Sequence, residues 1–374
     1  MANELLLVGS IAYDTAEEVF RSIAPRLGQS LPYIPDGETG ERQYWVNHIA
    51  YRVLHGHPDI ETVSRPMTAE GVECWHEPYD YGMWQFKIKK GVKQVRFGDH
   101  GRRLGYATDA ISSYFIFKTL RNEGVIKQGT KFQVCLPLTA SAVYRWLADK
   151  NDYPAIRDGF TEALYYEVKT IFNNIPHNDL AIQWDCAIED TVIEEALEKA
   201  GGLTSDVQTL ANDLFAPAKQ VSSHIPDAVT IGYHACYGTS GGWPKREPDD
   251  LTGAVLLCNA AVKSSGRRVD FLHIPTVASK GSNYFTPLSK LDPQGARVYM
   301  GLIHALHGDG GMRDQISTIK TYIDDFGIAA PCGFGRGPGK MSSQDGLETA
   351  NDYMEGLIND HITAVDLLHD VLNG

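Results

Sequence analysis

The sequence predicts a single α/β domain with the (β/α)8 barrel fold of the TIM type, and three observations support this prediction. A chain of 374 residues suits one elaborated barrel, although length alone would also allow two domains. Short apolar runs alternate with amphipathic stretches along the chain, which is typical of successive βα units and a parallel sheet. Eight such runs are present, and eight strands close a barrel of this kind. A doubly wound open sheet is the alternative.

The eight expected strands follow one another with room for a helix after most of them. They are residues 4–10, 31–36, 132–136, 180–185, 228–234, 269–274, 297–304 and 327–332. After the first strand, residues 15–27 place apolar side chains at positions 19, 20, 23 and 27, which is one face of a helix. Residues 159–173 and 190–200 show a similar helical period.

A long insertion after the second strand interrupts this rhythm. We expect residues 57–107 to form a lid or hairpin subdomain over the active-site rim, with a turn at Lys90-Gly91 between two alternating arms. Trp75, Tyr81 or Trp84 would then reach the cavity, and Trp84 is the candidate substrate contact. A satellite subdomain or a dimer contact is the alternative.

Composition restricts the function classes. The formal net charge of -13 argues against nucleic acid and against anionic membranes as partners. No run approaches the length of a membrane span, and the first residues lack a basic segment followed by a long apolar one. The six cysteines are scattered along the chain, which is typical of reduced thiols rather than of a disulfide framework. We therefore expect a cytoplasmic protein with a small-molecule substrate, and a homo-oligomer is compatible with the sequence.

Reactive side chains gather at the carboxyl ends of the expected strands, where barrel enzymes assemble their sites. These residues are Ser10, Asp36, Glu38, Asp185, His234, Cys236, His273, His304 and Cys332. His234 and Cys236 are two positions apart, so on an extended chain both face the same side. Zinc accepts such mixed nitrogen and sulfur ligands, with Cys332 as the distant third. A chance pair of core residues is the alternative for His234 and Cys236.

At these residues the sequence resembles the uroporphyrinogen decarboxylase/methionine synthase-like superfamily, and in particular the C-terminal barrel of cobalamin-independent methionine synthase. The resemblance runs from about residue 5 to the end, outside the insertion. It is carried by Val8-Gly9-Ser10, Asp36-Gly37-Glu38, Ile182-Gln183-Trp184-Asp185, Tyr233-His234-Ala235-Cys236-Tyr237, Gly301-Leu302-Ile303-His304 and Cys332-Gly333. The family fold is a (β/α)8 barrel.

The resemblance implies a role for each of these positions. His234, Cys236 and Cys332 would bind Zn²⁺, and His304 would transfer a proton. Substrate contacts would come from Ser10, Asp36, Glu38 and Asp185. If Glu38 and Asp185 have no such role, they would cap loops or pair with arginines such as Arg42.

Two departures from the family pattern bear on the activity. The family's glutamate ligand at the end of strand six is replaced by Pro275, which has no ligating atom, and His273 is the candidate substitute. Cys186 stands where the family has a second acid after Asp185. We therefore expect an enzyme other than a methionine synthase: a zinc-dependent alkyl (methyl) transferase acting on a small thiol. A lyase that cleaves a carboxyl, carbon–carbon or carbon–oxygen bond in a small, aromatic substrate at the same rim is the alternative.

Overall fold

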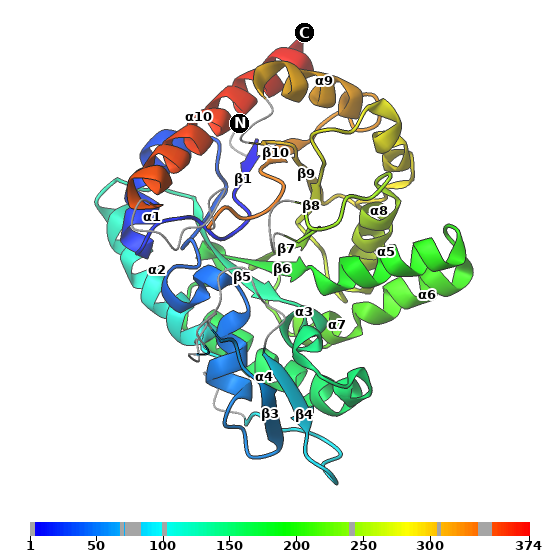
Figure 1. Ribbon diagram of the computed structural model, residues 1–374. Coiled ribbons are helices and arrows are strands. Elements are labelled where there is room, and N and C mark those ends of the chain that lie inside the picture. Colours follow the sequence, from blue (N-terminus) through cyan, green and yellow to red (C-terminus); the bar gives the residue numbers. More distant parts are fainter. Residues whose placement is uncertain are drawn as a thin grey trace.

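Eight parallel strands lie at the centre of the molecule and helices surround them (Figure 1). The structure is a computed structural model and describes residues 4–67, 71, 84–98, 103–238, 244–304, 308–335 and 346–374. The central strands are β1 (Leu5–Leu6), β2 (Tyr33–Pro35), β5 (Lys131–Pro137), β6 (Leu180–Cys186), β7 (Thr230–Ala235), β8 (Phe271–Pro275), β9 (Arg297–Gly301) and β10 (Gly327–Ala329).

The strand order confirms the barrel. The sheet runs β1-β10-β9-β8-β7-β6-β5-β2, and every neighbouring pair is parallel. Chain order is therefore followed around the sheet, with the first strand beside the last, whereas a doubly wound sheet reverses at a switch point. Between β1 and β2, the Leu5 amide donates to the Ser30 carbonyl at 3.2 Å, and the Ile11 amide donates to the Gly37 carbonyl at 2.9 Å. These bonds bring the two edges together and nearly close the barrel.

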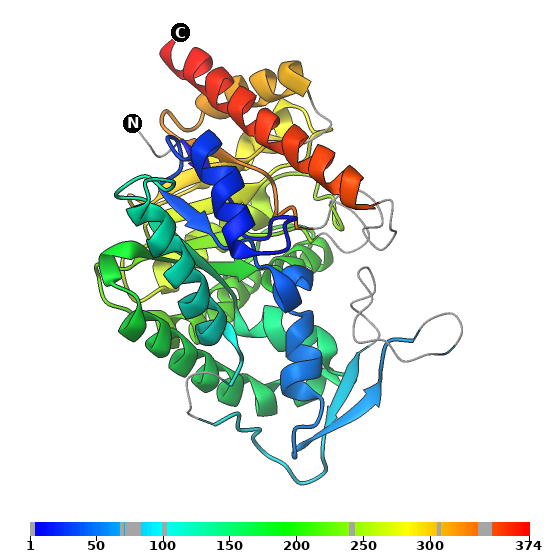
Figure 2. The ribbon, with the colours of Figure 1, turned by 90° about the vertical axis from the view of Figure 1, so that its left-hand side faces the viewer.

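Helices cover the outside of the sheet. They are α1 (Ala16–Leu27), α2 (Tyr106–Asn122), α3 (Thr139–Val143), α4 (Tyr153–Asn174), α5 (Ile188–Ala200), α6 (Ser205–Leu214), α7 (Ala216–Ser222), α8 (Thr252–Ser264), α9 (Gly308–Lys320) and α10 (Gly346–Asn373). The long α10 lies along α1, so the last helix of the chain packs beside the first (Figure 2). None of the helices in the described ranges is long and apolar enough to cross a membrane.

Helix α1 shows how the local sequence sets an element. Thr15 accepts a hydrogen bond from the Glu18 amide while the Glu18 carboxylate accepts one from the Thr15 amide, which is a capping box. Val19, Phe20 and Ile23 are fully buried on one face. This is the face that the sequence predicted, and the helix begins at Ala16, one residue after the expected start, because Thr15 is its N-cap.

The insertion contains a two-stranded antiparallel hairpin, but its strands differ from the prediction. Strand β4 (Gln85–Ile88) pairs with β3 (Ile60–Ser64), which precedes it, and both lie at one edge of the molecule (Figure 1). The predicted turn at Lys90-Gly91 is present, with Gly91 at φ +89°, yet no strand follows it. Instead the Val95 amide donates to the Ala155 carbonyl at 2.8 Å. Contact with α4 therefore replaces the expected second arm.

Trp84 lies in the core of this insertion. Its ring stacks on Phe86 with centroids 5.7 Å apart, lies 5.5 Å from the His55 ring, and is 4% exposed. Trp75 and Tyr81 lie outside the described residues. A lid function for the insertion stays a prediction.

Candidate metal centre and cavity

Two rim segments, at the ends of the non-neighbouring strands β7 and β10, bring three metal-ligating side chains together. His234 is the penultimate residue of strand β7, and Cys236 follows directly after that strand. Cys332 lies three residues after the end of β10. The Cys236 and Cys332 sulfurs are 3.3 Å apart, and the Cys332 sulfur is 3.9 Å from His234 Nε2. All three ligand atoms lie within 4.8 Å of one another. Within the part of the chain that the structure describes, no other group of three histidine, cysteine or acidic side chains meets this condition.

The separations fit a zinc ion. Zinc–sulfur bonds of about 2.3 Å and zinc–nitrogen bonds of about 2.0 Å at tetrahedral angles place two sulfurs about 3.8 Å apart and a sulfur and a nitrogen about 3.5 Å apart. The observed sulfur–sulfur separation of 3.3 Å is shorter and the sulfur–nitrogen separation of 3.9 Å is longer, each by about half an ångström or less. The sulfurs are too far apart for a disulfide, whose bond is about 2.05 Å. The hydrogen bond with the Cys332 thiol and then burial raise the pKa of Cys236, so a cation is needed to hold it as a thiolate at neutral pH.

His273 lies behind His234 rather than beside the two thiols. Its Nε2 is 3.0 Å from the Ala330 carbonyl, and its Nδ1 is 2.7 Å from Nδ1 of His234. A carbonyl only accepts, so the His273 proton is on Nε2 and its Nδ1 accepts from His234. Burial lowers the pKa of both rings, that of His273 to about 4, so both are neutral. The His234 proton is thus on Nδ1, and its Nε2 presents a lone pair to the metal cluster.

A cavity of about 290 Å³ opens next to the cluster and is lined by all three candidate ligands. Ser10, Glu38 and Asp185 line it as well, so six of the predicted site residues face one space. The segment that carries Cys332 packs tightly on the end of β1. A Cβ at Gly333 would collide with the Ser10 hydroxyl and lie 3.0 Å from the Ser10 backbone nitrogen, so glycine suits this close approach.

Glu38 and Asp185 form an acidic pair on the cavity wall. Both are nearly buried, at 6% and 5% exposure. Burial and then the charge of Glu38 raise the pKa of Asp185 above its ordinary value. Gln183 donates to Asp185 at 2.8 Å, and the Trp45 side chain also hydrogen-bonds to it. A cationic or proton-bearing group of a ligand would relieve the repulsion between the two acids.

Backbone strain is concentrated at the same wall. Glu38 and Trp45 both adopt the left-handed region, at φ +51° and +55°. Such conformations cost about 1–3 kcal/mol in non-glycine residues and persist where the surroundings impose them, often at functional sites.

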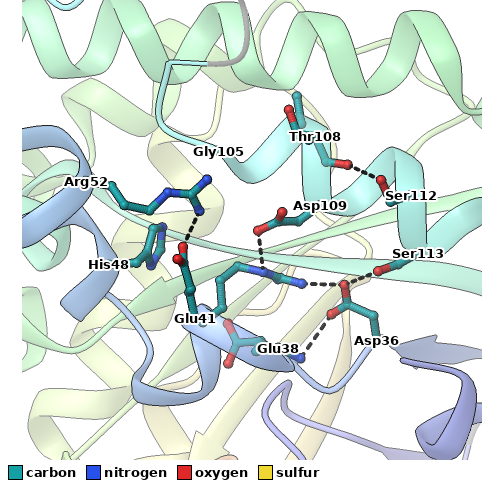
Figure 3. A network of polar contacts seen from close by, with 12 residues as sticks. Asp36, Glu38, Glu41, His48, Arg52, Gly105, Thr108, Asp109, Ser112 and Ser113 are labelled. Atoms are coloured by element: carbon teal, nitrogen blue, oxygen red, sulfur yellow. Dashed lines mark hydrogen bonds and ion pairs between the residues drawn. The ribbon is translucent and has the colours of Figure 1, made fainter. Parts of the chain in front are cut away.

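Asp36 stabilises the turn that carries Glu38. Its carboxylate accepts from the Glu38 amide at 3.0 Å and from the Ser113 hydroxyl at 2.8 Å, and it pairs with the buried Arg42 (Figure 3). Arg42 also pairs with Asp109 at 3.1 Å. Asp36 is not among the residues that line the cavity. Substrate contact by Asp36 stays a prediction, and the contacts observed are those of a positioning residue for Glu38.

His304 lies beyond the end of β9, outside the cavity lining. Its Nε2 is 3.4 Å from the hydroxyl of Thr276, which donates to the Gly301 carbonyl. Proton transfer by His304 stays a prediction.

The sequence reasoning missed several residues of the cavity lining, among them Trp45, Arg145, Lys245 and Arg246. Arg145 lies in the short 3-10 helix Tyr144–Trp146 after α3, Trp45 follows the 3-10 helix Gly40–Tyr44, and the other two lie in the segment after β7. None of them belongs to a recognisable motif.

The chain matches no protein-family model, and no curated protein is significantly similar to it. The functional interpretation therefore depends on the geometry of the metal cluster and its cavity.

Proposed function

We propose that this protein is a zinc-dependent alkyl transferase that acts on the thiol of a small molecule. The observation that carries the proposal is the triad of His234, Cys236 and Cys332, whose ligand atoms lie within 4.8 Å of one another and line an open cavity. Three protein ligands with a fourth position open to solvent or substrate are typical of catalytic zinc, whereas structural zinc has four protein ligands.

When bound there, zinc would supply a Lewis acid that lowers the pKa of a substrate thiol, so that a thiolate nucleophile exists at neutral pH. The protein's own residues would do the rest. His273 would hold His234 in the ligating tautomer through the 2.7 Å hydrogen bond. Glu38 and Asp185 would bind a polar or cationic group of the substrate and orient its thiol toward the triad.

The resemblance to the methionine synthase barrel supports this proposal. The positions it implies for substrate contact, Ser10, Glu38 and Asp185, line the same cavity as the three implied zinc ligands. Membership of that superfamily is part of the proposal.

One observation favours a lyase as the second candidate. Asp185 faces the cavity, and burial and then the charge of Glu38 raise its pKa, which is the direction that suits a carboxyl group to general-acid catalysis. In that case the metal site would polarise a substrate oxygen rather than bind a thiol.

Thiol binding to the metal-loaded protein distinguishes the two candidates. Cobalt(II) replaces zinc in the full-length protein, and 2-mercaptoethanol is added at pH 7. We expect a new sulfur-to-cobalt absorption band and the release of one proton per thiol bound. Cys258→Ser, in the buried helix α8, is the matched control and should behave like the wild type. Bound cobalt whose spectrum does not respond to the thiol would contradict the transferase and favour the lyase.

A further inference from the structure

One residue of the cavity lining has a backbone conformation that its side chain disfavours. Trp45, which follows the 3-10 helix Gly40–Tyr44, has φ +55° and ψ −115°. Residues other than glycine with positive φ lie mostly in the left-handed helical region, where ψ is about +30 to +60°, and a bulky residue outside it is strained. Glycine would adopt the same backbone without strain. The chain therefore has its largest kind of side chain where the backbone favours the smallest.

Hydrogen bonds on both sides of Trp45 hold this conformation. The Trp45 amide donates to the Arg42 carbonyl at 2.7 Å. Nδ1 of His48 lies 2.9 Å from the Trp45 carbonyl, and a carbonyl only accepts, so the ring proton is on Nδ1. Burial lowers the pKa of His48 to about 3, so the ring is neutral. The π-helical turn Ile49–Leu54 follows directly, and such turns are frequent at functional sites.

Core packing accounts for the indole only in part. Trp45 is partly buried against the core, and it also lines the cavity beside the triad. Its side chain hydrogen-bonds to Asp185, and the N–H is the ring's one polar group, so a ligand meets its apolar surface. Val8 and Ile188 add apolar surface to a lining that otherwise carries acidic and basic side chains. The indole is the largest side chain among the described residues of this lining.

We propose that Trp45 is a specificity-determining residue, whose ring packs against an apolar group of the substrate. Strained backbone in a residue other than glycine persists where its surroundings impose it, and it clusters at active sites and ligand clamps. His48 is then a positioning residue, which acts on the substrate only through Trp45. The inference rests on the proposed function in one respect, namely that the cavity beside the triad holds the substrate.

The test compares two thiols on the cobalt-loaded, full-length protein. Phenylmethanethiol carries an apolar group, and 2-mercaptoethanol does not. We expect the wild type to bind phenylmethanethiol about tenfold more tightly, because burial of its ring removes apolar surface from water. In Trp45→Ala most of this preference should be lost, whereas Trp45→Phe, which keeps an aromatic ring, should retain it. An unchanged preference in Trp45→Ala would overturn the proposal.

A second measurement tests the strain. Trp45→Gly and Trp45→Ala both remove the ring, but only glycine adopts the observed φ and ψ without strain. We expect the melting temperature of Trp45→Gly to exceed that of Trp45→Ala by about 1–3 °C, although glycine is normally the less stabilising of the two. A lower melting temperature in Trp45→Gly would refute the strain on which the proposal depends.

The control for strain relief is Gln294→Gly. Gln294 has φ +48°, is exposed and is not among the residues that line the cavity. Its replacement by glycine should raise the melting temperature and leave the preference for phenylmethanethiol at the wild-type value. If the preference falls as it does in Trp45→Ala, a general change of the fold and not the Trp45 ring is responsible.

The positioning role of His48 needs its own pair of variants. His48→Asn can place a side-chain N–H where Nδ1 donates to the Trp45 carbonyl, and His48→Leu removes the donor. We expect His48→Leu to lower the preference for phenylmethanethiol at unchanged cobalt binding, and His48→Asn to keep most of it. Added to Trp45→Ala, His48→Leu should change the preference no further. A further loss in this double variant would contradict action through Trp45.

Metal-free protein separates this inference from the proposed function. Calorimetry measures the binding of benzyl alcohol, which carries the same apolar group without a thiol, and we expect Trp45→Ala to weaken it. If this holds while the cobalt spectrum responds to no thiol, the inference stands and the transferase is refuted. A thiol response whose selectivity is the same in Trp45→Ala would refute the inference alone. Neither a thiol response nor binding of benzyl alcohol would refute both.

Discussion

Replacing His273 tests how the fold prepares His234 to bind metal. In His273→Leu the two hydrogen bonds of the ring, at 2.7 Å to His234 and 3.0 Å to Ala330, are lost at a position with 0% exposure. The buried N–H of His234 is then left without its acceptor, at a cost of about 1–3 kcal/mol, or the proton moves to Nε2 and blocks ligation. Loss of such a supporting contact typically lowers metal affinity about 10–100-fold, or roughly 1.4–2.7 kcal/mol.

The assay is a competition titration of zinc against a chelating dye, with circular dichroism as the check on folding. His273→Asn is the matched variant, because its side-chain oxygen can occupy the position of Nδ1 and accept from His234. We expect it to retain most of the affinity that His273→Leu loses. Unchanged zinc affinity in His273→Leu would refute the argument. A changed set of ligands in the cobalt spectrum of His273→Leu would instead make His273 a direct ligand, as the sequence suggested.

Three further predictions concern the same rim. Removing zinc and adding a mild oxidant should join Cys236 and Cys332, whose sulfurs are 3.3 Å apart, in a disulfide that mass spectrometry detects and that bound zinc prevents. Glu38→Gly should raise the free energy of unfolding by about 1 kcal/mol in denaturant titrations, because it relieves φ +51°, and should weaken substrate binding; a loss of stability would contradict this. Burial raises the pKa of Glu189 to about 7 in the folded protein. The protonated carboxyl group therefore contributes to the free energy of unfolding at low pH, and this contribution is lost as the pH rises from about 4.5 to 7. Glu189→Gln should therefore flatten the pH dependence of stability in that window, and an unchanged slope would count against the shift.

The barrel was predictable because each central strand is a local apolar run. A parallel strand that is buried on both faces is a continuous apolar run, so it can be recognised from its own residues alone. Strand β6, for example, is buried along its whole length. The α1 cap is equally local, since Thr15 and Glu18 are three residues apart. The β3–β4 pairing was not predictable in the same way. The turn at Lys90-Gly91 is a local signal, but the partner of β4 is chosen by tertiary contacts far along the chain.

The site was predictable to the extent that its residues end strands. Ser10, Asp185 and His234 meet at one mouth because the barrel brings its strand ends together. Asp36 ends a strand as well, but its carboxylate pairs with Arg42 and it does not line the cavity. This pairing is a tertiary contact, and strand position alone does not predict it. Arg145 carries no sequence signal, since a single arginine outside any motif has the same sequence pattern whether its side chain faces a cavity or solvent.

The zinc content of the purified protein tests the central claim most directly. Full-length wild-type protein prepared without chelators is analysed by mass spectrometry of its metals, beside Cys236→Ser and the control Cys258→Ser. We predict about one zinc per chain in the wild type and the control, and little in Cys236→Ser at unchanged secondary structure. Zinc near zero in the wild type that added zinc does not raise, or full retention in Cys236→Ser, would contradict the assignment of the triad as a metal site.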